Sequence, residues 1–151
     1  MGAQASLEHL TVPINGLDMQ ITLAGQGEAL LLLHGFPDSS KLWRKMIPGL
    51  ADVGFRVIAP DQRGFGETTA PEHVSDYSIA QIAADAIAVL DALGIERAAL
   101  MGHDWGALIG WRLAADHPDR FSCFVALSVG HPKAMIDAGF RQKLKSWYFI
   151  L

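Results

Sequence analysis

The sequence predicts an α/β fold in which a mostly parallel sheet carries helices on both faces. Short apolar runs without alternation recur at 29–33, 55–59, 98–101 and 121–128. Such runs are typical of strands that are buried on both faces of a parallel sheet. Helical patterns separate the runs, and strands that alternate with helices imply βαβ crossovers. The chain has 151 residues, of which 50% are hydrophobic and 19% charged, so we expect a globular protein.

The first element in chain order is an antiparallel hairpin at the edge of the sheet. Leu10, Val12 and Ile14 alternate with other residues, and a second alternating run follows at 19–23. Asn15-Gly16 lies between the two runs and is a strong signal for a two-residue hairpin turn. The sheet is therefore predicted to begin with an antiparallel pair before the parallel strands.

Two helices have clear boundaries in the sequence. An apolar stripe extends over 78–93, where the first residue and Gln81 form a capping box and Gly94 is placed to end the helix. A second helix is predicted from about 105 to 116, ended by Pro118.

The residues that follow the apolar runs are the candidates for chemistry. Ligands of open α/β sheets bind beyond the carboxyl ends of the strands. His34-Gly35-Phe36-Pro37 follows the first run, and Gly102-His103-Asp104-Trp105-Gly106 follows the third. The second stretch has the Gly-x-Nuc-x-Gly spacing of a nucleophile elbow, with Asp where esterases have Ser. The two glycines are expected to let the strand and the next helix approach closely.

We predict that Asp104 is a nucleophile. A carboxylate with an ordinary pKa near ~3.9 is ionised at neutral pH and needs no base to activate it. It suits attack on a saturated carbon that bears a leaving group, and the product is an alkyl–enzyme ester. The backbone N–H groups of Phe36 and Trp105 are placed to form an oxyanion hole for hydrolysis of that ester. The alternative is that Asp104 is an ordinary helix N-cap.

Four stretches together resemble the N-terminal half of the α/β-hydrolase-fold epoxide hydrolases, from about Leu10 onward: HGFPDSSKLW, VIAPDQRGFGETTAP, GHDWGALIGWRLAADHPDR and SVGHP. The resemblance implies that epoxides are opened to diols through an ester on Asp104. It also implies that the oxyanion hole and substrate site include His34, Gly35, Phe36, Pro37 and Trp105. In this family two tyrosines of a cap protonate the opened epoxide, and Tyr148 resembles the first of them.

The same resemblance divides the chain into two parts. Residues 1–130 match the N-terminal part of the hydrolase core, and 131–151 match the start of the cap. The general base of the family is a His near the end of a much longer chain, and it has no match here. We therefore expect an N-terminal portion whose ester persists, with a complementary C-terminal portion or a second copy as partner.

Two other functions stay open at this point. Haloalkane dehalogenases share the HDWG stretch but often have Asn at the position of Phe36, where a side-chain N–H holds halide. Fluoroacetate dehalogenases usually have Arg at the position of Trp105. Both departures favour an epoxide hydrolase over either kind of dehalogenase. The remaining alternative is a catalytically incomplete fragment that acts as a scaffold or interaction piece.

Charge and cysteine content narrow the partners and the location. A net charge of -4 gives no basic surface for nucleic acid, and no apolar run reaches the ~18 residues of a membrane span. The single cysteine, Cys123, lies in an apolar run, so we expect a buried inert thiol and a reducing, cytoplasmic compartment. No metal or cofactor is expected, and the small-molecule partners are an epoxide and water.

Several polar and aromatic residues near these turns are expected to have structural roles. Asp61 and Arg63 are predicted to brace their own loop, and His34 to organise the loop that contains it. Tyr77 is interpreted as a structural residue of the loop before the second predicted helix.

Overall fold

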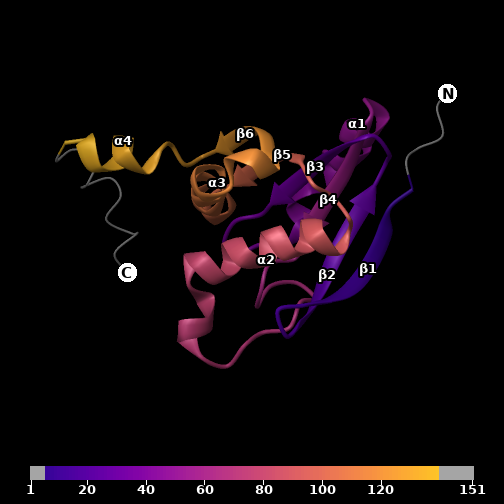
Figure 1. Cartoon of the computed structure of the whole chain (residues 1–151), viewed down its shortest axis with the longest axis horizontal. Coiled ribbons are helices and arrows are strands. Elements are labelled where there is room, and N and C mark those ends of the chain that lie inside the picture. The colour runs from indigo at the N-terminus through magenta and orange to yellow at the C-terminus, as the bar shows by residue number, and fades with distance from the viewer. Residues whose placement is uncertain (1–5, 140–151) are drawn as a thin grey trace.

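The structure, a computed structural model, describes residues 6–139, and these form a sheet with helices on both faces (Figure 1). The strands are β1 (Glu8–Ile14), β2 (Leu17–Ala24), β3 (Glu28–Leu33), β4 (Phe55–Pro60), β5 (Ala98–His103) and β6 (Phe121–Leu127). The α-helices are α1 (Ile47–Asp52), α2 (Ile79–Ala92), α3 (Trp105–Asp116) and α4 (Pro132–Asp137). Short 3-10 helices are η1 (Ser40–Lys45), η2 (Val74–Tyr77) and η3 (Pro118–Arg120).

The strand order places two glycine turns side by side. Across the sheet the order is β1-β2-β4-β3-β5-β6, with antiparallel pairing of β1 to β2 and of β2 to β4, and parallel pairing of the rest. The predicted, mostly parallel sheet is confirmed. The chain passes from β4 on one side of β3 to β5 on the other, so a topological switch point lies between β3 and β5. Leu33 is opposite Gly102 there.

The N-terminal hairpin is confirmed at the edge of the sheet. Ile14 pairs with Leu17, so the connection has two residues. Asn15 has φ 50° and Gly16 has φ 78°, and two positive φ angles are those of a type I′ turn, which matches the twist of the flanking strands.

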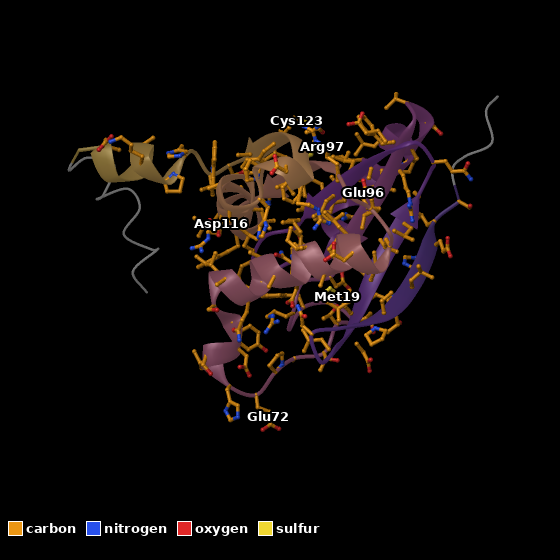
Figure 2. All side chains as sticks on the ribbon, in the orientation of Figure 1. Met19, Glu72, Glu96, Arg97, Asp116 and Cys123 are labelled. Atoms are coloured by element: carbon orange, nitrogen blue, oxygen red, sulfur yellow. The ribbon has the colours of Figure 1, made fainter. Side chains whose placement is uncertain are left out.

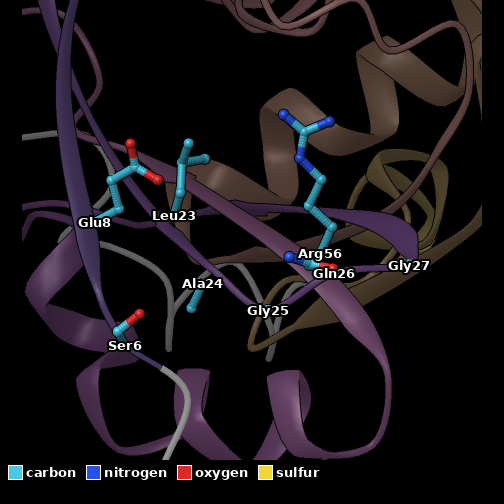
Figure 3. A pocket seen from close by; sticks show the side chains of 8 residues that line it. All are labelled: Ser6, Glu8, Leu23, Ala24, Gly25, Gln26, Gly27 and Arg56. Carbon is cyan, nitrogen blue, oxygen red and sulfur yellow. The ribbon is translucent and has the colours of Figure 1, made fainter.

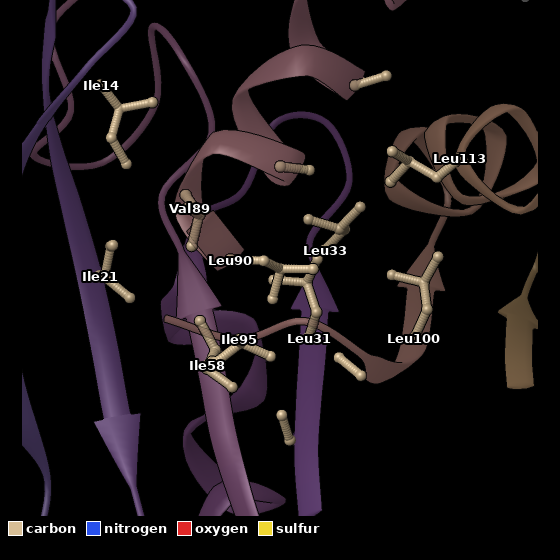
Figure 4. Close-up of a cluster of buried hydrophobic side chains, with 14 of the residues drawn as sticks. Ile14, Ile21, Leu31, Leu33, Ile58, Val89, Leu90, Ile95, Leu100 and Leu113 are labelled. Carbon is tan, nitrogen blue, oxygen red and sulfur yellow. The ribbon is translucent and has the colours of Figure 1, made fainter. Parts of the chain in front are cut away.

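Alternate residues of the central strands fill two separate cores. Leu31 and Leu33 of β3 point to the face that α2 and α3 cover, where they join Ile58, Leu90 and other side chains (Figure 4). Leu30 and Leu32 point to the opposite face, which η1 and α1 cover. Full burial of each leucine stabilises the fold by about 1.5–3 kcal/mol. Both faces of the central strands are therefore anchored by buried side chains.

Helix α2 begins and ends where the sequence predicts. The Ser78 side chain accepts a hydrogen bond from the N–H of Gln81. At the other end Gly94 has φ +67°, and the N–H of Ile95 donates to the carbonyl of Leu90 at 2.8 Å. This is the Schellman pattern, which satisfies the last carbonyls of a helix.

Strand β6 is less buried than predicted. Ser122 and Cys123 are exposed, and Val125 is 42% exposed. The prediction that Cys123 is buried was therefore wrong, and its side chain lies on the outside of the molecule (Figure 2). The physical reason is position: within residues 6–139, β6 lies at the edge of the sheet, and α3 packs on only one of its faces, where Phe124 contacts Trp111.

The predicted cap segment is described only in part. Helix α4 follows β6 and projects away from the sheet (Figure 1). The boundary at 130 stays a prediction. Within residues 6–139, every helix is too short or too polar to cross a membrane.

Candidate active site

Asp104 lies at the turn between β5 and α3, and its backbone is strained. Its φ of 55° and ψ of -118° fall outside the regions that residues other than glycine usually occupy. Its N–H donates to the carbonyl of Leu127 at 3.1 Å, whereas its side chain makes no capping hydrogen bond to α3. The carboxylate therefore does not act as the ordinary N-cap that was the alternative interpretation.

Three glycines allow the close approach at this turn. A Cβ on Gly102 would lie 2.3 Å from the carbonyl oxygen of Gly106, and a Cβ on Gly106 would lie 2.1 Å from that of Leu33. A Cβ on Gly35 would lie 2.5 Å from the Cβ of Asp104. The expectation that Gly102 and Gly106 permit a sharp strand-to-helix turn is confirmed, and Gly35 extends the requirement to the neighbouring loop.

One predicted oxyanion donor contacts the Asp104 carboxylate directly. The N–H of Phe36 donates to Asp104 Oδ1 at 3.1 Å. Among the described residues, no group donates a hydrogen bond to the other oxygen, Oδ2. The N–H of Trp105 is one of the first amides of α3, which have no acceptor within the helix. The Phe36 and Trp105 side chains are 63% and 44% exposed, respectively, and Pro37 is also exposed.

His34 lies beneath this loop rather than in the site. It is 0% exposed, its Nδ1 lies 2.8 Å from the carbonyl oxygen of Gly35, and its Nε2 accepts from the N–H of Gln62 at 2.9 Å. Burial lowers the pKa of His34 below its ordinary value, against opposing contributions from the Gly35 carbonyl and nearby carboxylates. The neutral ring thus joins the loop after β3 to the loop after β4, as expected of a loop organiser.

Asp61 braces the loop after β4, as predicted. Its carboxylate accepts hydrogen bonds from the N–H of Ser40 at 2.7 Å and from the N–H of Glu67 at 3.0 Å. It is 3% exposed, and Gly66 leaves the space that the carboxylate occupies.

Arg63 makes a buried ion pair that the sequence did not indicate. Its guanidinium donates to both carboxylate oxygens of Asp85 at 2.6 and 2.7 Å, and to the carbonyl of Asp76 at 2.5 Å. Asp85 also accepts from the Asn15 side chain at 2.8 Å. The hydrogen bond to Asp85 raises the pKa of Arg63. The sequence offered no signal for this pair, because α2 contains both Asp85 and Asp91, and only the structure shows that Asp85 is the buried one.

A cavity of about 170 Å³ lies next to the elbow, where Gly35, Phe36 and Trp105 form part of its lining. It is largely apolar and aromatic, and Asp104 is not part of its lining; the lining residues are Gly35, Phe36, Gln62, Arg63, Phe65, Tyr77, Ile82, Trp105 and Ile109. Three of the predicted site residues therefore gather here: Gly35, Phe36 and Trp105. The Tyr77 hydroxyl also donates a hydrogen bond to the carbonyl of Pro71 at 2.8 Å. Sequence reasoning missed Phe65, Ile82 and Ile109, because they come from separate elements.

A larger hollow of about 650 Å³ opens at the other end of the sheet, where β3 and β4 begin (Figure 3). Glu8 and Arg56 are its charged lining residues. It lies away from the carboxyl ends of the parallel strands, where ligands of such sheets bind, so it is not the candidate site.

Tyr148 lies outside the described residues, and its role as a proton donor stays a prediction. Between residues 6 and 139, no three His, Cys, Asp or Glu side chains gather in a way that could hold a metal ion.

Comparisons with known proteins agree with this geometry. The family model for the alpha/beta hydrolase fold matches residues 28–149. The chain is 43% identical over 148 residues to Epoxide hydrolase 2 of Siraitia grosvenorii, and 40% identical over 146 residues to Epoxide hydrolase A of Mycobacterium tuberculosis. These alignments cover 95% and 93% of this chain, but 47% and 45% of those relatives.

Solved structures give the same result. An epoxide hydrolase from Vigna radiata superimposes with a TM-score of 0.80 at 42% identity, over 84% of this chain and 43% of that one. Epoxide Hydrolase A from Mycobacterium thermoresistibile gives 0.79 at 38% identity, over 88% and 44%. The chain thus spans less than half the length of these relatives. The match over residues 28–149 shows that the chain belongs to the alpha/beta hydrolase fold family, and the relatives and solved structures given above are epoxide hydrolases.

Proposed function

We propose that this chain is the nucleophile-bearing part of an enzyme that hydrolyses epoxides to diols. The observation that carries the proposal is the Asp104 carboxylate, which is held at Oδ1 by the N–H of Phe36 while Oδ2 is left without a hydrogen-bond donor among the described residues. One oxygen is thereby oriented and the other is available for attack.

In the first step Oδ2 of Asp104 attacks an epoxide carbon. A carbon–oxygen bond forms to the carboxylate as the epoxide carbon–oxygen bond breaks, and the electron pair moves to the epoxide oxygen. That oxygen takes a proton from a phenol, a role proposed for Tyr148 because a phenol with a pKa near ~10 is protonated at neutral pH. The product is an alkyl ester of Asp104.

In the second step water attacks the ester carbonyl carbon, the bond from that carbon to the alkyl oxygen breaks, and the diol leaves as the Asp104 carboxylate is restored. The oxyanion that forms would accept hydrogen bonds from the N–H groups of Phe36 and Trp105. The step needs a base that removes a proton from water, and no residue of this chain is assigned to it. Turnover is therefore proposed for the whole protein and ester formation for this chain.

The cavity supports an apolar or aromatic substituent on the epoxide. Phe36, Phe65 and Trp105 line it, and its volume of about 170 Å³ accommodates a small ring. The proposal includes a cytoplasmic location, which the single free thiol supports. It also includes a partner, either a complementary C-terminal portion or a second copy, since the open edge at β6 suits pairing with a further strand.

The test is to incubate the chain with styrene oxide and to locate the added mass by peptide mass spectrometry. We expect addition at Asp104 in the wild type and none at that position in Asp104→Asn. Halide release from a haloalkane, measured in parallel, tests the dehalogenase alternative. An unmodified Asp104 alongside equal labelling of surface carboxylates in both proteins would count against the proposal and would favour a fragment without catalytic activity.

A further inference from the structure

The peptide unit between Gly35 and Phe36 is held at both of its polar ends. Its N–H, which belongs to Phe36, donates to Asp104 Oδ1 at 3.1 Å. Its carbonyl, which belongs to Gly35, lies 2.8 Å from Nδ1 of His34 and accepts from the N–H of Asp38 at 3.2 Å. Because the peptide unit is planar, the groups that fix the carbonyl also fix the direction of the N–H.

Gln62 determines which nitrogen of the His34 ring carries the proton. The backbone N–H of Gln62 donates to Nε2 at 2.9 Å, so Nε2 is the acceptor. A neutral imidazole then carries its proton on Nδ1, which is the nitrogen that faces the Gly35 carbonyl. The Gln62 side chain donates to the His34 carbonyl at 2.6 Å and joins the two loops a second time.

We propose that His34 is a positioning residue that aims the N–H of Phe36 at the nucleophile. The order of donors is Gln62 N–H to His34 Nε2, His34 Nδ1–H to the Gly35 carbonyl, and Phe36 N–H to Asp104. The catalytic consequence rests on the proposed function, whereas the hydrogen-bond order does not. Successive hydrogen bonds polarise one another, so the donor on the carbonyl also strengthens the N–H at the other end of the peptide unit.

Two substitutions separate this role from simple packing. Asn at position 34 offers an amide N–H in the region of Nδ1, but its shorter side chain places no acceptor at the position of Nε2, where the Gln62 N–H points. Gln at position 34 offers an oxygen in the region of Nε2, but it places no N–H at the position of Nδ1, which faces the Gly35 carbonyl. Each variant loses one of the two ring hydrogen bonds, so the two are matched in the number of contacts removed.

The experiment measures ester formation at Asp104 with styrene oxide, together with ¹⁵N and amide-proton NMR spectra of the chain. We expect His34→Gln to slow ester formation about 10-fold, because the carboxylate is oriented less well for attack; this is less than the ~100-fold that a misplacement of about 1 Å can cost. We expect His34→Asn to stay within about threefold of the wild type. The Phe36 amide proton should shift upfield in His34→Gln, because its hydrogen bond weakens, and much less in His34→Asn.

Equal slowing and equal amide shifts in the two variants would overturn the positioning role and leave His34 as a packing residue. A wild-type ring that carries its proton on Nε2 would also overturn it, whatever the activity. If the wild type forms no ester while the ring and amide spectra are as expected, the proposed function fails and the positioning of the peptide unit stands.

Discussion

Asp61 and Asp104 have similar sequence settings and opposite structural settings. Each follows a buried strand and precedes a glycine-containing turn. Asp61 is 3% exposed and accepts one backbone N–H at each carboxylate oxygen. Asp104 is half-buried, has a strained backbone, and accepts a single hydrogen bond at one oxygen among the described residues.

The difference separates a carboxylate that braces a loop from the carboxylate that we propose as the nucleophile. Both groups are close to backbone donors, so proximity to N–H groups does not distinguish them. At Asp61 both oxygens are occupied, and the charge is used to hold a loop. At Asp104 the backbone is strained to present the carboxylate, and one oxygen stays free. Backbone strain of this kind persists where the surrounding structure enforces it, often at functional sites.

The largest expected effect on stability comes from Asp85, a third carboxylate, which like Asp61 has a structural role. Asp85→Leu should lower the free energy of unfolding by about 3–5 kcal/mol, because it leaves the buried Arg63 guanidinium without its partner. Urea denaturation followed by circular dichroism measures the change. In the double variant Arg63→Met/Asp85→Leu most of the loss should be recovered, since no buried charge remains. A double variant as unstable as Asp85→Leu would contradict this account.

The geometry of the elbow gives the next effect. Gly106→Ala should cost about 3 kcal/mol, because the new Cβ would lie 2.1 Å from the carbonyl oxygen of Leu33 and 2.6 Å from that of His34. Gly49→Ala in α1 is the matched control, since a Cβ there meets nothing within 4 Å. It should be neutral or stabilise the fold by up to about 1 kcal/mol. Similar unfolding midpoints for the two variants would show that the elbow tolerates a side chain at Gly106.

Replacing each carboxylate by an amide, in Asp61→Asn and in Asp104→Asn, tests the comparison between these two residues directly. Asp61→Asn should lower stability by about 1–3 kcal/mol. The NH₂ group of the new asparagine would face the backbone N–H of Ser40 or of Glu67, and that N–H would lose its acceptor. Asp104→Asn should change stability by less than about 0.5 kcal/mol. Labelling by styrene oxide should show the reverse pattern: Asp61→Asn keeps the addition at Asp104, and Asp104→Asn loses it. Equal stability losses would mean that the two carboxylates are equally structural.

The smallest effect is the pH dependence that His34 contributes. Burial lowers its pKa, so below its ordinary value of 6.5 the unfolded chain binds a proton that the folded chain binds only at lower pH. The stabilising contribution is therefore full above the ordinary pKa and declines as the pH falls, by at most about 1.4 kcal/mol per unit. Urea denaturation between about pH 8 and about pH 5 should give a steeper decline in the wild type than in His34→Asn. Parallel curves would show that His34 does not make this contribution.

Much of the fold could be predicted because the signals are local. The turn at Asn15-Gly16, the cap at Ser78 and the end of α2 at Gly94 each depend on the conformations available to a few neighbouring residues. The position of Asp104 between two glycines was equally readable, since the sharp turn excludes a Cβ at both flanks. These features need no knowledge of distant segments.

Burial at β6 and the pairing of Asp85 could not be predicted in this way. The runs at 29–33 and 121–128 look alike as apolar segments, yet β3 is central and β6 is an edge strand. Likewise, Asp85 is 22 residues from Arg63 in the chain, and nothing local marks the contact. Which segment covers a strand, or which charge meets another, depends on the arrangement of whole elements.

The sequence by itself determined the order of the strands and helices along the chain, because hydrophobic runs and periodicity mark them. It also determined the glycine elbow with a carboxylate at its tip, because the sharp turn leaves no room for a Cβ at Gly102 or Gly106. The motifs predicted that the Phe36 N–H lies near Asp104, but only the tertiary structure decided that β3 and β5 are neighbours and that this N–H donates to Oδ1. It also decided that Asp61 is held at both oxygens while Asp104 is held at one. Contacts between segments far apart in the chain form only when the whole sheet assembles, and no short stretch of sequence contains them.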